Sequence, residues 1–239
     1  MSIAERLITV AENVPKVYEA GQKAEYNRLW DTLVPTSDGN MAFRFCGDWT
    51  KGTLRPNKDL RPRNAQGMFY EFNSYDITDL EQHFADIGVV LDFSNNASFS
   101  STFASIRCPL KIGVIDASSA TKIAYLLNNS TGVTGIKKLI LPEKYGSNPF
   151  NNAFNYAKGL KDIEMEGTIP VSINFLDCPL TPNSMKSIIG CLKNQINETM
   201  AFMVSVLFSN ACWAALEADS TAPDGGTWQD YVTSLGWLF

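Results

Sequence analysis

Pairs of apolar residues recur along the middle of this chain at a constant spacing of 24 residues. Each pair has one residue between its members, and the pairs are Leu91/Phe93, Ile115/Ala117, Leu139/Leu141 and Ile163/Met165. Alternate apolar residues are typical of a strand with one buried face. A fixed period of about 20–29 residues is typical of leucine-rich repeats, in which neighbouring repeats bury one another's apolar faces.

The predicted fold is therefore α+β, a degenerate leucine-rich-repeat β-solenoid with an N-terminal helical segment and end caps. Residues 77–176 form the predicted solenoid, and residues 35–76 and 177–239 form its caps, because a stack of repeats needs distinct ends. The C-terminal cap is expected to contain a helix that carries Met185, Ile188, Ile189 and Leu192, an internal strand over 200–208 and a short helix over 211–218.

Residues 1–34 are predicted to form a helical segment that assembles or anchors the protein. Apolar residues follow one another at steps of 4, 3, 4 and 3, the spacing of a coiled-coil seam: Ile3, Leu7, Val10, Val14 and Val17. Pro15 divides the segment into two helices. We expect a homo-oligomer, with a trimer favoured over a dimer. The alternative is an amphipathic pair that folds back on its own chain.

Composition excludes several classes of protein. The chain has 20 basic and 25 acidic residues, so binding to nucleic acid through phosphates is not expected. No run of about 18 apolar residues indicates a membrane span, and the first residues lack the pattern of a secretory signal peptide. One histidine, His83, rules out a two-histidine metal site, and we expect no metal or cofactor. The five dispersed cysteines are predicted to be free and buried.

Catalysis is not expected. His83 lies in a helical pattern over 80–85, where a surface role is commoner than that of a base. The carboxylate pairs Glu164/Glu166 and Asp76/Asp79 could flank a glycosidic bond or a cation, but acidic residues on a solvated sheet face are far commoner.

The outward strand positions are the predicted binding face. They are mixed apolar and acidic, which suits a protein or polysaccharide partner better than an anion: Asp92, Asp116, Lys138, Ile140, Asp162 and Glu164.

Several stretches resemble known repeats. VVLDFSNNASFSSTFASI (89–106), GVIDASSATKIAYLL (113–127) and FNNAFNYAKGLKDIEMEG (150–167) resemble the BspA-like leucine-rich repeats of bacterial surface proteins. FLDCPLTPNSMKSIIGCLKN (175–194) looks like the last repeat and following helix of that group. The second stretch, 113–127, departs from the pattern because Ala117 replaces a large core residue. The opening AERLITVAENVPKVYEAGQKAEY is similar to prophage-encoded proteins of gut Firmicutes.

This resemblance implies a non-catalytic structural protein of a phage tail or virion, which presents a surface to a bacterial protein or polysaccharide and contacts other tail proteins. The alternative is an adhesin or interaction protein on the bacterial cell surface. A carbohydrate-active enzyme is a third, less favoured class.

Overall fold

The computed structural model describes residues 59–72, 74, 76–198 and 203–239. The predicted assembly residues Ile3, Leu7, Val10, Val14 and Val17 lie outside these residues, as does most of the predicted N-terminal cap. The described elements, in chain order, are α3 (Leu80–Asp86), β1 (Leu110–Asp116), β2 (Val133–Ile140), β3 (Asp162–Glu166), β4 (Ile173–Asn174), α4 (Pro182–Gly190), β5 (Val206–Leu207), α5 (Asn210–Asp219) and α6 (Trp228–Ser234).

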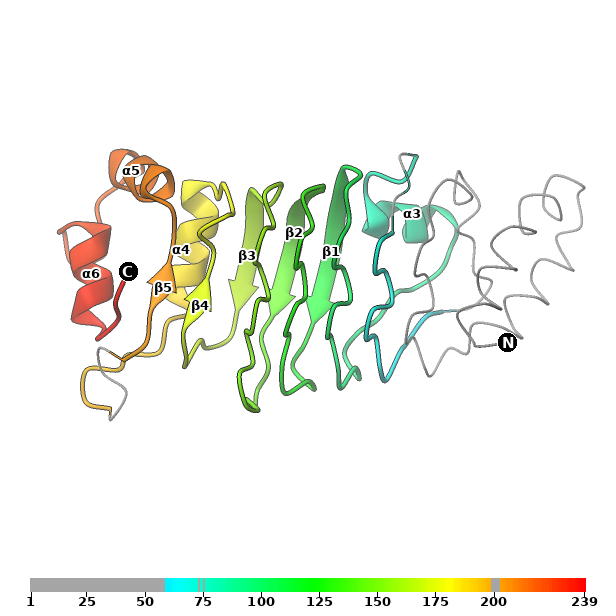
Figure 1. Ribbon diagram of the computed structural model, residues 1–239, viewed down its shortest axis with the longest axis horizontal. Coiled ribbons are helices and arrows are strands. Elements are labelled where there is room, and N and C mark those ends of the chain that lie inside the picture. Colours follow the sequence, from blue (N-terminus) through cyan, green and yellow to red (C-terminus); the bar gives the residue numbers. More distant parts are fainter. Residues whose placement is uncertain (1–58, 73, 75, 199–202) are drawn as a thin grey trace, which may run out of the picture.

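Two parallel sheets organise the described chain. Strands β1, β2 and β3 lie side by side in that order, and β4 pairs with β5 (Figure 1). Between β1 and β2, and between β2 and β3, the chain returns along the sheet before it enters the next strand. A parallel pair requires such a return, because both strands must start at the same edge.

The returning chain consists of successive β-turns, which also bond to one another. Within residues 123–130, the amides of Leu126, Asn128 and Ser130 each donate to the carbonyl three residues earlier. Between neighbouring segments, the Phe103 N–H donates to the Leu126 carbonyl at 3.0 Å and the Leu127 N–H to the Ala153 carbonyl at 2.7 Å. The turn segments therefore form a second hydrogen-bonded layer opposite the sheet.

The core is buried between the sheet and the turn segments, and aromatic rings fill much of it. Phe69 stacks on Phe103 with centroids 5.1 Å apart. Phe154 stacks on Phe175 at 4.5 Å, and Phe175 stacks on Phe208 at 5.7 Å. All five rings are buried. Stacked rings add about 0.5–1.5 kcal/mol per pair to the free energy that their burial supplies.

The predicted leucine-rich-repeat β-solenoid is wrong, although an α+β fold is compatible with the structure. The described strands form one sheet of three strands and one of two, not one continuous stack. Ile115 pairs with Leu139 as the 24-residue spacing predicts, but Leu139 pairs with Met165 and not with Ile163. Leu91 forms only an isolated bridge, with Leu60.

The failed pairing arises from a longer connection before β3, and a bulge follows within the pairing. Ile115 and its partner Leu139 are 24 residues apart, but Ile136 and its partner Ile163 are 27 residues apart. Ile163 pairs with Ile136, and Met165 pairs with Leu139. Between these two pairs, β2 has two residues, Lys137 and Lys138, and β3 has one residue, Glu164. Such an extra residue is the defining feature of a β-bulge. It shifts the later pairs by one residue, to a separation of 26 between Leu139 and Met165, so no pair of β2 and β3 follows the 24-residue spacing.

Helix α4 covers the outer edge of β3, where a further strand could otherwise pair. The Ile163 N–H donates to Ser184 Oγ at 2.9 Å, and the Met165 N–H donates to Ser187 Oγ at 2.8 Å. The two serines are three residues apart and so lie on one face of the helix. Their hydroxyl groups pair the strand amides that a neighbouring strand would otherwise bind.

Several local predictions are confirmed. Helix α4 contains Met185, Ile188 and Ile189 in its buried face, and α5 covers the predicted helix over 211–218. Leu192, also predicted on the first of these helices, lies after its end and forms an isolated bridge with Ile169. Of the predicted strand over 200–208, the described part contains only Val206–Leu207. The four described cysteines are free and buried: Cys108, Cys178, Cys191 and Cys212. Among the described residues, no helix is long and apolar enough to span a membrane.

Candidate functional site

The predicted binding face of the sheet has its charges paired internally. Lys138 of β2 lies 3.8 Å from Glu164 and contacts Glu166 more closely. The hydrogen bond to Glu166 is the main reason that the pKa of Lys138 is raised, and the charge of Glu164 adds to it. The structure therefore brings together two of the predicted residues, with Glu166 as a third member, in a network in which one lysine is shared by two carboxylates.

Two other predicted residues, Asp92 and Asp116, have a local structural role. Asp92 Oδ1 accepts the Ser94 N–H at 2.9 Å, and Asp116 Oδ1 accepts the Ser118 N–H at 3.0 Å. Both bonds form Asx turns, in which the side chain stabilises the turn that follows. Asp92 also lies 3.4 Å from Arg61, and the Ser94 bonds and this charge lower its pKa.

The remaining predicted residues do not converge with these. Ile140 pairs with Asp116 and Glu166 on its two sides, and Asp162 lies opposite Gly135 at the start of β3. Asp79, one of the candidate carboxylates, caps α3 by accepting the Gln82 N–H at 3.0 Å. No group of three metal-ligating side chains occurs within the described part of the chain.

A different surface emerges on the turn segments. Five exposed residues in two neighbouring segments have a positive φ between 49° and 59°, and we call them the turn face: Tyr125, Asn129, Asn148, Asn152 and Tyr156. The two segments are joined by backbone bonds, from the Tyr125 N–H to the Asn151 carbonyl and from the Asn129 N–H to the Asn155 carbonyl, each 2.9 Å. All five side chains are amides or phenols, so the turn face is uncharged.

The two tyrosines are unusual members of this set. The left-handed region is tolerated by Asn and Gly, but a bulky side chain is strained there. Tyr125 is nevertheless 37% exposed and Tyr156 52% exposed, so burial of the rings does not explain their presence. Because the positive φ of these two tyrosines costs backbone energy and is not explained by packing, we look for a function of their side chains.

Neighbouring polar groups position both rings. Asn151 Nδ2 donates to the Tyr125 hydroxyl at 3.1 Å, across the two turn segments. The Tyr156 N–H donates to Asp177 Oδ2 at 3.0 Å, and Lys158 Nζ lies 5.6 Å from the centroid of the Tyr156 ring. These contacts hold the rings at the surface and leave part of each exposed.

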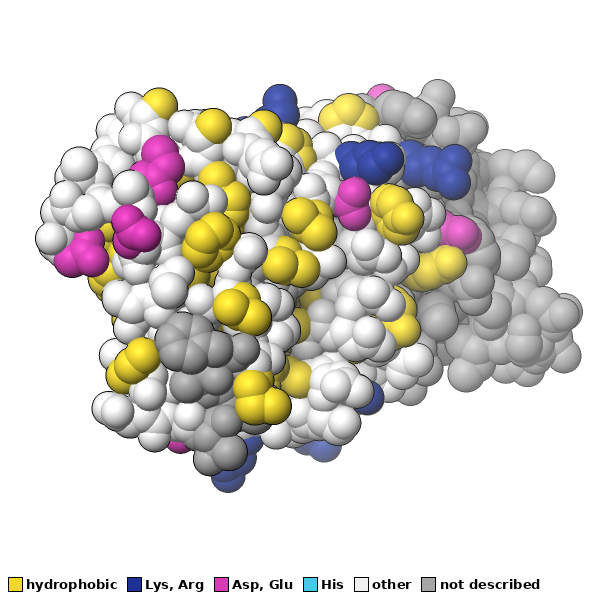
Figure 2. Space-filling model, turned by 60° about the vertical axis from the view of Figure 1, so that its left-hand side comes forward, with side chains coloured by type: hydrophobic (Ala, Val, Ile, Leu, Met, Phe, Trp, Pro, Cys, Tyr) yellow, Lys and Arg dark blue, Asp and Glu magenta, His cyan; other side chains and the backbone are white. Residues whose placement is uncertain are grey.

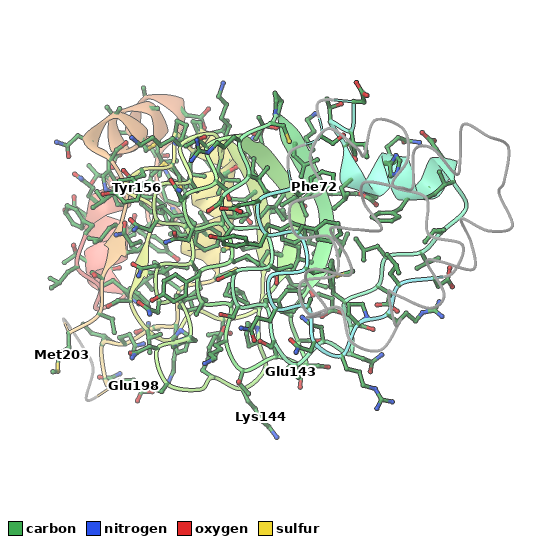
Figure 3. The ribbon with its side chains drawn as sticks, turned by 45° about the vertical axis from the view of Figure 1, so that its right-hand side comes forward. Phe72, Glu143, Lys144, Tyr156, Glu198 and Met203 are labelled. Atoms are coloured by element: carbon green, nitrogen blue, oxygen red, sulfur yellow. The ribbon has the colours of Figure 1, made fainter. Side chains whose placement is uncertain are left out.

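The turn segments run along the height of the molecule. In Figure 3, Tyr156 lies well above Met203, level with Phe72 at the end of another turn segment. Figure 2 shows a face on which hydrophobic side chains are scattered among neutral polar groups, with the charged side chains mostly near its margins.

Sequence reasoning missed the turn face because it followed apolar periodicity. The signal was present in the run of asparagines and aromatics over 148–156. Asparagine is enriched several-fold in the left-handed region, so asparagines at steps of four residues indicate repeated positive-φ turns.

Comparisons with known proteins identify no relative: no model of a known protein family, no curated protein and no solved structure matches the chain. The resemblance to BspA-like repeats therefore stays a prediction.

Proposed function

We propose that this chain is a non-enzymatic recognition protein of a bacteriophage tail or virion, and that its turn face binds an uncharged polysaccharide on the bacterial surface. The observation that carries the proposal is the pair of exposed tyrosines, Tyr125 and Tyr156, held in a strained conformation on a face whose other positive-φ residues are asparagines. The partner class was open between protein and polysaccharide, and the chemistry of this face favours the latter.

A sugar ring has an apolar face of C–H groups and a rim of hydroxyl groups. Aromatic rings carry a partial negative charge on their faces, which attracts polarised C–H groups. Asparagine amides offer both donors and an acceptor, as hydroxyl groups require. Tyrosine and asparagine also order few rotatable bonds on binding, so a surface made of them loses little conformational entropy.

The virion assignment is supported by the resemblance to prophage-encoded openings and by the coiled-coil spacing over residues 1–34. It predicts that the protein co-purifies with phage particles. Mass spectrometry of gradient-purified particles tests this, and detection only in the soluble fraction of the lysate would contradict it.

Binding is tested by replacing both tyrosines with asparagine, because asparagine tolerates the same φ and the turns are retained. The full chain is applied to an immobilised panel of neutral and acidic bacterial polysaccharides. We expect binding to at least one neutral polysaccharide, and at least a tenfold loss of binding in the double variant Y125N/Y156N.

The matched control is E71N, which places asparagine at another positive-φ position, 55°, outside the turn face. We expect it to bind as the unmodified chain does. Binding confined to acidic polysaccharides, binding to none of the panel, or equal binding by Y125N/Y156N would overturn the proposed function.

A further inference from the structure

A cleft of about 430 Å³ opens beside the lower end of the turn face. It lies between the turn that contains Asn148 and Asn151, the chain that enters β4, and the chain around Met203 and β5. Figure 3 shows Met203 at this lower end of the molecule. Asn148 belongs both to the turn face and to the cleft wall, so the two surfaces are continuous.

The described lining of the cleft is amphipathic and uncharged. Phe150, Val171 and Ile173 supply apolar surface, and Asn148, Asn151 and Asn174 supply amides. No Lys, Arg, His, Asp or Glu occurs among the described residues that line it. A charged ligand would lose its hydration here without gaining a counter-charge, so the cleft favours a neutral ligand.

Two of the amides have complementary capacities for hydrogen bonds. Asn174 Oδ1 accepts the Leu176 N–H at 2.9 Å, and no described residue accepts from its Nδ2. Asn151 Nδ2 donates to the Tyr125 hydroxyl at 3.1 Å, and no described residue donates to its Oδ1. The cleft therefore contains one amide with donors to offer and one with an acceptor.

We infer that the cleft receives a single uncharged pyranose unit, the end of the polysaccharide chain that the turn face binds. Each sugar hydroxyl both donates and accepts, so neighbouring hydroxyl groups can use the Asn174 donors and the Asn151 acceptor together. The volume lies within the range of small-ligand sites, about 300–1,000 Å³. This inference rests on the proposed function, because it names the subsite that terminates the same binding surface.

The test uses the full chain and saturation-transfer NMR with methyl glycosides of glucose, galactose, mannose and N-acetylglucosamine, and with glucuronic acid as an anionic probe. We expect saturation transfer to at least one neutral glycoside and none to glucuronic acid. The variant N174D keeps the oxygen that accepts the Leu176 N–H but replaces the donors with a charge, so the signal should fall at least tenfold.

The control variant is N194D. Asn194 Oδ1 accepts the Ile196 N–H at 3.0 Å in the same type of turn, and Asn194 is exposed and does not line the cleft. It should bind the glycoside as the unmodified chain does. Absence of transfer to every neutral glycoside, stronger transfer to glucuronic acid, or an unchanged signal in N174D would overturn the inference.

The two proposals fail in different ways. If polysaccharide binding depends on Tyr125 and Tyr156 but the glycosides show no transfer, the cleft is not the subsite and the turn face stands. If the panel gives no binding while a glycoside still depends on Asn174, the cleft binds a sugar and the proposed function of the turn face fails.

Discussion

The hydroxyl groups of α4 provide the sharpest test of how the sheet ends. Ser184 Oγ accepts the Ile163 N–H at 2.9 Å and donates to the Lys161 carbonyl at 3.1 Å. Replacing Ser184 with alanine removes both bonds without adding volume. Because Ser184 is only 4% exposed and Ile163 is buried, water cannot readily replace the lost hydroxyl group.

The expected loss of stability follows from these bonds. A buried amide left without a partner costs about 1–3 kcal/mol, and alanine returns about 0.5 kcal/mol through its higher helix propensity. We therefore expect S184A to lower the free energy of unfolding by about 2 kcal/mol. Ser187 is half-buried, so water can reach the Met165 N–H and S187A should cost less, about 1 kcal/mol.

Urea unfolding monitored by tryptophan fluorescence measures both variants. The control is S147A, which changes an exposed serine in the turn after β2 and should leave the midpoint unchanged. S184T, which keeps the hydroxyl group, should recover part of the loss. A stability of S184A equal to that of S147A would refute the view that α4 takes the place of a strand at this edge.

Other predictions concern glycines, thiols and surface ion pairs. A Cβ on Gly132 would lie 2.2 Å from the Cys108 carbonyl oxygen, so G132A should unfold at a much lower temperature. A Cβ on Gly190 would have no atom within 4 Å, so G190A should unfold at the same temperature or be up to about 1 kcal/mol more stable. Burial raises the pKa of Cys191 from 9.0 to about 11 and also raises the pKa of Cys108. The unfolded chain therefore loses these protons at lower pH than the folded protein does, and the free energy of unfolding should fall as pH rises from about 9 to 11 under reducing conditions. A free energy of unfolding that stays constant over this range would contradict the prediction. The four described thiols should not react with an aromatic disulfide reagent at pH 8 in the folded protein, which a reaction of more than one thiol per chain would disprove. K138A removes only surface ion pairs, so the urea midpoint should stay close to that of the unmodified chain; a clearly lower midpoint would contradict this.

The apolar pattern located the strands but not their pairing. Alternation around 115, 139 and 163 falls within β1, β2 and β3. The register failed because the chain between β2 and β3, residues 141–161, has 21 residues, whereas the chain between β1 and β2, residues 117–132, has 16. A fixed period counts residues from repeat to repeat and does not show how they divide between strand and connection, so it cannot fix which residues pair.

Helices α4 and α5 were predictable because their periodicity is local. That α4 would close the edge of β3 was not, because two serines at a spacing of three have no distinctive meaning until the strand amides opposite them are known. The contacts of the predicted binding residues were also not predictable. Outward position was inferred correctly for Lys138 and Glu164, but their mutual pairing depends on the bulge that brings Lys138 beside both Glu164 and Glu166.

The turn face depends on bonds between neighbouring segments, which no single stretch of sequence shows. Its asparagines and its tyrosines nevertheless differ in how well they suit a positive φ. Asn129 and Asn152 occupy positive-φ positions that asparagine accepts at little cost. Tyr125 and Tyr156 occupy equivalent positions at a cost of about 1–3 kcal/mol each. Since asparagine would satisfy the same backbone, the fold does not require the tyrosines. The proposed function accounts for their exposed rings through a partner that stacks on them, whereas Lys138 of the sheet is paired with its own neighbours, Glu164 and Glu166.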